Sequence, residues 1–191
     1  MHRISRYGIG LLLSVVLLVS CGRNDEMKDT SDKETHAFVS SDQETSDELM
    51  ETIIEGINNK DLDSVKNIFS VNTINSDENL DEEIQGLFDF MSGDIVSYEE
   101  SDPSSSFDSF DKNYKIRMIS SFYYVSTEKE KYFFLINNYS MNTKDTDMQG
   151  VKYLIVVKAD DRLKVFDKNE KILFDENGKI ERTGIFIPNI Y

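Results

Sequence analysis

The chain opens with an apolar run that differs from everything after it. Residues 7–19 are mostly apolar, and three basic side chains, His2, Arg3 and Arg6, precede them. A helix needs about 20 apolar residues to cross a bilayer, so this run is too short for a membrane span. A basic start, a short apolar run and a small residue at Ser20 are typical of a secretory signal peptide, which we predict over residues 1–20.

A polar stretch separates this run from three amphipathic segments. Residues 21–45 hold few apolar side chains, so they cannot offset the entropy of ordering, and we predict a disordered acidic tether. Thr45-Ser46-Asp47-Glu48 matches a capping box and predicts the start of the first helix. Its apolar positions share one helical face: Leu49, Met50, Ile53, Ile54 and Ile57.

Two further helices are predicted from their end signals. Asp61 can cap a short second helix, and Asn79 with Glu82 suggests the start of a third. Gly93 is expected to end that third helix. Gly86 costs about 1 kcal/mol relative to alanine inside a helix, so we expect another element to cross closely there.

The period then changes from helical to alternating. The predicted strands cover residues 94–99, 114–124, 131–139, 151–158 and 163–166, with an acidic, serine-rich loop over 100–111. The Asn-Gly pair at 177–178 suits a tight hairpin between residues 171–174 and 179–182. Helices followed by antiparallel strands predict an α+β fold. The strands at 131–139 and 151–158 are apolar on both faces, so the tail at 171–191 or a second copy of the chain should cover the face without helices.

The segment Leu18-Val19-Ser20-Cys21 resembles a bacterial lipobox. In such a sequence the cysteine thiol receives a diacylglyceryl group, and the cysteine becomes the mature N-terminus. The resemblance implies a protein held on the extracytoplasmic face of the cell membrane by the lipid on Cys21. Two or three acyl chains would make this attachment stable, whereas one chain holds only marginally. The alternative is an ordinary cysteine just past an uncleaved anchor.

Two stretches carry a resemblance that covers about residues 46–166. Residues 58–70 resemble a segment common in NTF2-like cones, and residues 80–98 resemble a family of uncharacterised bacterial lipoproteins of Gram-positive type. That family is known only as a domain of unknown function. It is expected to adopt the NTF2-like, cystatin-related cone, in which N-terminal helices pack on a curved antiparallel sheet. The remainder, 167–191, is expected as a hairpin and tail packing on or beside the sheet.

Charge and composition exclude several classes of partner and chemistry. The net charge of −15 becomes −17 once Arg3 and Arg6 leave with the signal peptide, and such a surface repels nucleic-acid phosphates. No histidine, cysteine or tryptophan occurs in residues 46–191. This domain therefore holds neither a Ser-His-Asp nor a Cys-His nucleophile, and no zinc site built on histidine or cysteine. We expect no catalytic residue, cofactor or metal ligand.

NTF2-like cones often hold a pocket between the helices and the sheet, and the chain has residues that could line one. Asp61 or Asp94 could supply an acid. The candidate donors are Tyr98, Tyr123, Tyr124, Tyr139 and Tyr153. The alternative is structural: tyrosines satisfied in the core, and aspartates that cap a helix or form a turn.

Residues 145–150 begin like a calcium loop. The twelfth position, which needs a bidentate glutamate, is Val156, so a solvated loop is the alternative.

Three functions follow from these patterns. The leading hypothesis is a lipid-anchored lipoprotein whose non-catalytic domain binds a small apolar ligand or an envelope protein. The second is a small isomerase- or dehydratase-like enzyme with a Tyr/Asp pocket. The third is a structural or regulatory partner of an envelope protein that acts through the sheet face.

Overall fold

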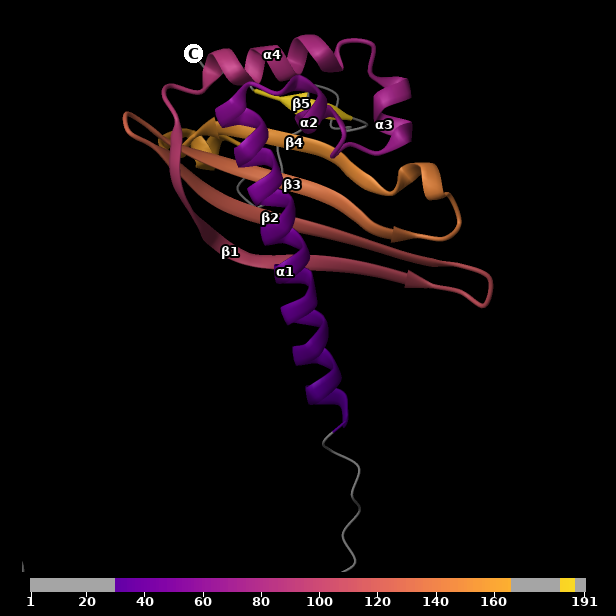
Figure 1. The fold of residues 1–191 in the computed structure, drawn as a ribbon. Helices are drawn as coiled ribbons and strands as arrows, with labels where there is room; N and C mark the ends of the chain where they lie inside the picture. The colour runs from indigo at the N-terminus through magenta and orange to yellow at the C-terminus, as the bar shows by residue number, and fades with distance from the viewer. Residues whose placement is uncertain (1–29, 166–182, 188–191) are drawn as a thin grey trace, which may run out of the picture.

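The computed structural model describes residues 30–165 and 183–187, and over these residues the fold is α+β (Figure 1). Four α-helices precede the strands, and two short 3₁₀ helices, η1 and η2, flank β4. The elements are α1 (Thr30–Asn59), α2 (Leu62–Lys66), α3 (Val71–Ser76), α4 (Leu80–Phe90), β1 (Ile95–Phe110), β2 (Lys115–Thr127), β3 (Lys131–Asn142), η1 (Thr146–Met148), β4 (Gly150–Lys158), η2 (Ala159–Lys164) and β5 (Gly184–Phe186).

The first helix starts earlier than the capping box suggested. α1 begins at Thr30, so the start predicted at Thr45-Ser46 is wrong. Both hydroxyls donate instead to the carbonyl one turn back, Thr45 to Ser41 at 2.9 Å and Ser46 to Asp42 at 2.8 Å. A serine or threonine inside a helix uses this bond because the backbone N–H groups are already paired. α1 therefore includes residues 30–45, which were predicted to belong to the disordered tether. Residues 1–29 lie outside the described part of the chain.

The two later helices start where they were predicted to start. Asp61 caps α2, since its carboxylate accepts from the Ser64 backbone N–H at 3.0 Å and from the Ser64 hydroxyl at 2.8 Å. These bonds hold the pKa of Asp61 below its ordinary value. α4 starts after Asn79 as predicted, although the Asn79 side chain makes no capping hydrogen bond. The helix ends at Phe90 with Met91 as its C-cap, so the stop predicted at Gly93 is three residues too late. No helix was predicted where α3 lies.

The sheet has the order β1-β2-β3-β4-β5 and is not closed. The first four strands are antiparallel, whereas β5 pairs parallel with β4, so the sheet is mixed. The loop predicted over residues 100–111 is wrong, because β1 continues through it to Phe110 with register shifts on the way. An edge strand with mostly exposed side chains tolerates serines and carboxylates, and pairing with β2 outweighs their low strand propensity.

Strands β3 and β4 were predicted correctly, and both of their faces are buried. The helix-facing cluster includes Tyr132, Phe134 and Val156, while Phe133, Leu135 and Val157 belong to a second cluster on the opposite face. Val165 packs in this second cluster. The strand predicted at 163–166 is wrong, because η2 occupies residues 159–164. The predicted hairpin at 171–182 lies outside the described residues.

Helix α1 crosses the helix-facing side of the sheet, and its first turns extend beyond β1 (Figure 1). Met50, Ile53 and Ile57 on its inner face are buried in the main core. Burying such a side chain contributes about 1.5–3 kcal/mol, so these three residues give α1 most of its attachment. Among the described residues, no helix is long and apolar enough to cross a membrane.

The closely packed glycine is Gly56 rather than Gly86. A Cβ placed on Gly56 would lie 2.6 Å from Val65 Cγ2 of α2, whereas a Cβ on Gly86 would meet nothing within 4 Å. The crossing expected at Gly86 is therefore wrong, and the close approach is between α1 and α2.

Alanine substitutions at these two glycines should have opposite effects. Gly56→Ala should lower the free energy of unfolding by about 1–3 kcal/mol, because the added methyl overpacks against Val65. Gly86→Ala is the matched control and should raise it by about 0.5–1 kcal/mol through helix propensity alone. Urea unfolding measures both. Equal effects of the two substitutions would contradict the packing described here.

Candidate functional site

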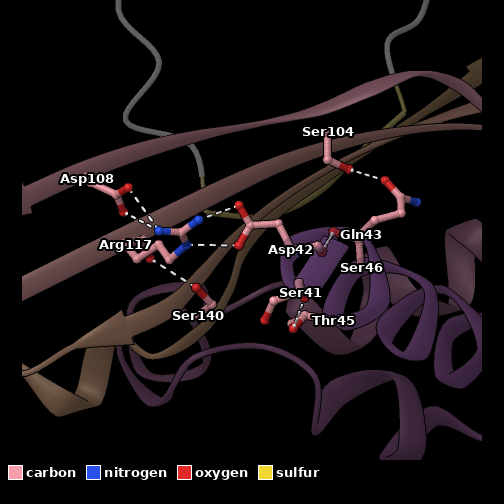
Figure 2. A network of polar contacts seen from close by, with 9 residues as sticks. All are labelled: Ser41, Asp42, Gln43, Thr45, Ser46, Ser104, Asp108, Arg117 and Ser140. Atoms are coloured by element: carbon pink, nitrogen blue, oxygen red, sulfur yellow. Dashed lines mark hydrogen bonds and ion pairs between the residues drawn. The ribbon is translucent and has the colours of Figure 1, made fainter. Parts of the chain in front are cut away.

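Polar contacts join the first half of α1 to the sheet, and Arg117 of β2 lies at their centre (Figure 2). Its Nε donates to Asp42 Oδ1 at 2.8 Å and its Nη2 to Asp42 Oδ2 at 2.5 Å. Its Nη1 donates to Asp108 of β1 at 2.9 Å. The Arg117 and Asp42 side chains are only 12% and 11% exposed. The bond to Asp42 raises the pKa of Arg117, so the guanidinium stays charged, and its two parallel bonds to Asp42 fix α1 against β2.

The second contact lies one turn further along α1, at Tyr123 of β2. The Tyr123 hydroxyl donates to Asp47 Oδ1 at 2.8 Å, and Gln43 Nε2 donates to the same oxygen at 2.9 Å. Ser104 of β1 in turn donates to Gln43 Oε1 at 3.0 Å (Figure 2). Tyr123 is fully buried, and burial followed by the bond to Asp47 raises the pKa of its hydroxyl. Tyr123 is therefore a neutral core tyrosine with a satisfied hydroxyl.

Tyr98 of β1 makes the third contact, at the edge of the same face. Its hydroxyl donates to Glu51 Oε1 at 3.2 Å, and its ring meets that of Tyr123 edge-on at a centroid distance of 5.8 Å. Burial, followed by the Glu51 carboxylate, raises the pKa of Tyr98. Asp47 and Glu51 are four residues apart on α1, so successive turns place one carboxylate against each tyrosine.

A groove of about 650 Å³ opens beside Tyr98, between the last turns of α1 and the start of β1. Residues from Glu51 to Asn59 form one wall, and residues 95–98 form the other. Ile54 and Val96 give it apolar surface, and Val96 is 61% exposed. Glu51 and Glu55 add two carboxylates. Pockets that bind ligands combine an apolar lining with a few polar groups in this way.

Asn58 lines this groove, and its side chain caps the edge of β1 at Ile95. Its Nδ2 donates to the Ile95 carbonyl at 3.1 Å, and its Oδ1 accepts from the Ile95 N–H at 2.8 Å. The side-chain amide therefore occupies both outward-facing backbone groups of Ile95. This satisfies the start of an edge strand that would otherwise be open to pairing with another chain.

The structure separates the other sequence candidates from this site. Tyr124 lies on the opposite sheet face, where its ring packs against Phe133 and Arg162. Tyr153 packs in the same cluster, and its burial raises its pKa to about 12. Tyr139 lines a different groove at the far end of β3.

Neither predicted acid partners a tyrosine at this site. Asp61 is the α2 cap, and Asp94 lies in the link between α4 and β1. The observed partners, Asp47 and Glu51, were not predicted, because Asp47 falls in a sequence that matches a capping box. The spacing of Gln43, Asp47, Glu51 and Glu55 was the available signal.

The loop at residues 145–150 binds its own polar groups. Asp145 Oδ1 accepts from the Asp147 N–H at 3.2 Å, and Asn142 Oδ1 accepts from the Asp145 N–H at 2.9 Å. Within the ranges 30–165 and 183–187, no three histidine, cysteine, aspartate or glutamate residues are grouped so that they could hold a metal ion. The calcium interpretation therefore gains no support from this loop.

Removing Asp42 should loosen the first half of α1. Asp42→Ala is expected to lower the free energy of unfolding by about 1–3 kcal/mol, because it leaves a mostly buried guanidinium without its bidentate partner. Amide hydrogen exchange should accelerate over residues 41–50 and stay unchanged in α4.

Asp108→Ala provides the control, since Asp108 is more exposed and binds Arg117 from β1 rather than from α1. It should cost less than about 1 kcal/mol and leave exchange in α1 unaltered. If both variants exchanged alike, Asp42 would not be what holds the helix.

Comparison with known proteins gives one family. A family model described as "Domain of unknown function (DUF5104)" matches residues 52–159. The matched region starts inside α1 and ends just past β4, so it includes most of the groove lining but not Asp42 or Asp47. A search of curated proteins gives no match.

Proposed function

Because the chain belongs to the DUF5104 family, a domain of unknown function, we propose its function from its sequence and from the groove beside α1. The protein is a lipoprotein anchored at Cys21 on the extracytoplasmic face of the membrane. Its domain binds a ligand in the groove between α1 and β1 and catalyses no reaction. The ligand is a small molecule or a segment of an envelope protein.

The anchor is supported by the sequence around Cys21. A basic start, a short apolar run, a small residue and the chain's one cysteine follow in the order that a lipobox requires. Cys21 itself lies outside the described residues. Eight residues separate it from Thr30, where α1 starts, and the groove lies at the other end of this helix.

The NTF2-like relationship is part of this proposal. Its support is the order of elements, with four helices before an antiparallel meander of β1 to β4 and α1 lying across one face (Figure 1). The parallel strand β5 lies beyond residues 46–166, where the resemblance ends.

The observation that favours binding is the groove itself. It offers apolar surface at Ile54 and Val96 beside two carboxylates, and it is open to solvent rather than filled by the core. The alternative, an isomerase- or dehydratase-like enzyme, would need a reactive carboxylate beside a free tyrosine hydroxyl. Asp47 and Tyr123 do meet, but each already satisfies the other, and the ring is fully buried. Their arrangement therefore supports a structural role better than acid–base chemistry.

The anchor can be tested by lipid labelling. Cells grown with radioactive palmitate should label the wild-type protein, and Cys21→Ala should carry no label and leave the membrane fraction. A wild-type protein without label, or a Cys21→Ala variant that stays on the membrane to the same extent, would contradict lipid anchoring.

The groove can be tested with Nile red, a neutral apolar dye that fluoresces when it leaves water. Val96→Ser should weaken dye binding about fivefold, since losing an apolar side chain from such a contact removes about 1 kcal/mol. Val71→Ser is the control, because Val71 is similarly exposed, at 50%, and belongs to α3. Dye binding that both variants leave unchanged would remove the groove as the binding site.

A further inference from the structure

The groove carries charge on one wall only. Glu51 and Glu55 line it from α1, whereas the β1 wall contributes Val96, Ser97 and Tyr98. Both glutamates are exposed. Glu51 accepts the Tyr98 hydroxyl bond, and across the described chain neither glutamate has a lysine or arginine partner. An occupant that contacts both walls would therefore meet uncompensated negative charge beside Ile54 on the α1 wall, and Val96 without any charged neighbour from β1 on the other.

The negative wall continues beyond the groove along α1. An adjoining depression of about 610 Å³ shares Glu51 and adds Glu44, Asp47 and Glu48. None of these three acids forms an ion pair with another described residue. From Glu44 to Glu55 the helix rises by about 16 Å at 1.5 Å per residue. A fully extended chain of about five residues has that length, at about 3.3 Å per residue.

The Asn58 cap restricts how a chain could lie there. Because Asn58 occupies the N–H and C=O of Ile95, an incoming chain cannot pair with Ile95 as another strand. Its contacts at this end must come from side chains, with apolar ones on Ile54 and Val96 and cationic ones on Glu51 and Glu55. Charge complementarity thus favours a basic occupant. Contacts with Ile54 and Val96 would distinguish a specifically bound segment from counterions that are attracted by charge alone.

We propose that the groove between α1 and β1 docks an extended basic segment of a partner protein, about five residues long, in which lysine or arginine alternates with apolar side chains. This inference rests on the proposed binding function of the groove and specifies its occupant. Alternation would place lysine or arginine against Glu51 and Glu55 on the α1 wall and apolar side chains against Val96 on the β1 wall, because successive side chains of an extended chain point to opposite sides. Exposed ion pairs are individually weak, so the apolar contacts must supply part of the affinity.

The test uses the rhodamine-labelled peptide Lys-Leu-Lys-Leu-Lys and its uncharged counterpart Gln-Leu-Gln-Leu-Gln, with binding followed by fluorescence anisotropy. The lysine peptide should bind the wild-type protein at least about tenfold more tightly than the glutamine peptide. The double variant Glu51→Gln/Glu55→Gln should lose about tenfold in affinity, since it removes two charges and keeps the acceptor for Tyr98.

A matched control makes the same charge change elsewhere. Glu78→Gln/Glu82→Gln also removes two exposed glutamates four residues apart, and neither residue lines this groove. It should leave peptide affinity within about twofold of wild type. If both double variants lost the same affinity for the lysine peptide, the peptide would be attracted by net charge alone, and the proposal would be overturned. Displacement of the peptide by spermidine at equal charge concentration would overturn it too.

Nile red separates failure of this inference from failure of the proposed function. If the dye binds in a manner that depends on Val96 but the lysine peptide does not bind, the groove remains a binding site and the basic occupant is wrong. If neither probe binds, both proposals are wrong.

Discussion

The structure depends on how α1 is held across the first two strands. Its apolar face is buried in the core, and three of its carboxylates bind groups on the sheet: Asp42 with Arg117, Asp47 with Tyr123 and Glu51 with Tyr98. The apolar contacts supply most of the free energy, because they remove large side chains from water. The polar contacts are directional, so they fix the rotation and position of the helix along the sheet. Both are needed for a groove of defined shape beside β1.

The same helix carries acids that bind the sheet and acids that are open to solvent, and Glu51 belongs to both groups because it binds Tyr98 and also lines the groove. The carboxylates that face the sheet are bound by a guanidinium or a phenol, and they help to stabilise the fold. Other acids of α1, such as Glu48 and Glu55, have exposed side chains and form no ion pair within the described part of the chain. The net negative charge of the protein is therefore not spread evenly over its surface. Part of it lies along one helix beside Ile54 and Val96, where the proposed basic segment would bind.

Sequence patterns predicted the elements that depend on local chemistry. The α2 cap at Asp61, the start of α4 and the two apolar strands β3 and β4 could all be predicted from neighbouring residues. The errors share a different cause. The second half of β1 exists because β2 pairs with it, although its serines and aspartates favour a loop. The crossing at Gly56 depends on where Val65 lies, which no local pattern encodes. The site was half predicted, since Tyr98 and Tyr123 were candidates but their acids lie 47 and 76 residues away along the chain.

The most direct test of this account is a titration of the tyrosine hydroxyls. The chain has nine tyrosines, and each one that ionises to tyrosinate increases the ultraviolet absorbance of the protein. If α1 is docked as described, burial and Asp47 keep Tyr123 protonated well above the ordinary tyrosine pKa of about 10. Wild type and Tyr123→Phe should then give the same titration curve until the alkaline unfolding transition. A variant curve that lacks one tyrosine titrating near pH 10 would show that water reaches Tyr123, and the docked helix and its groove would be contradicted.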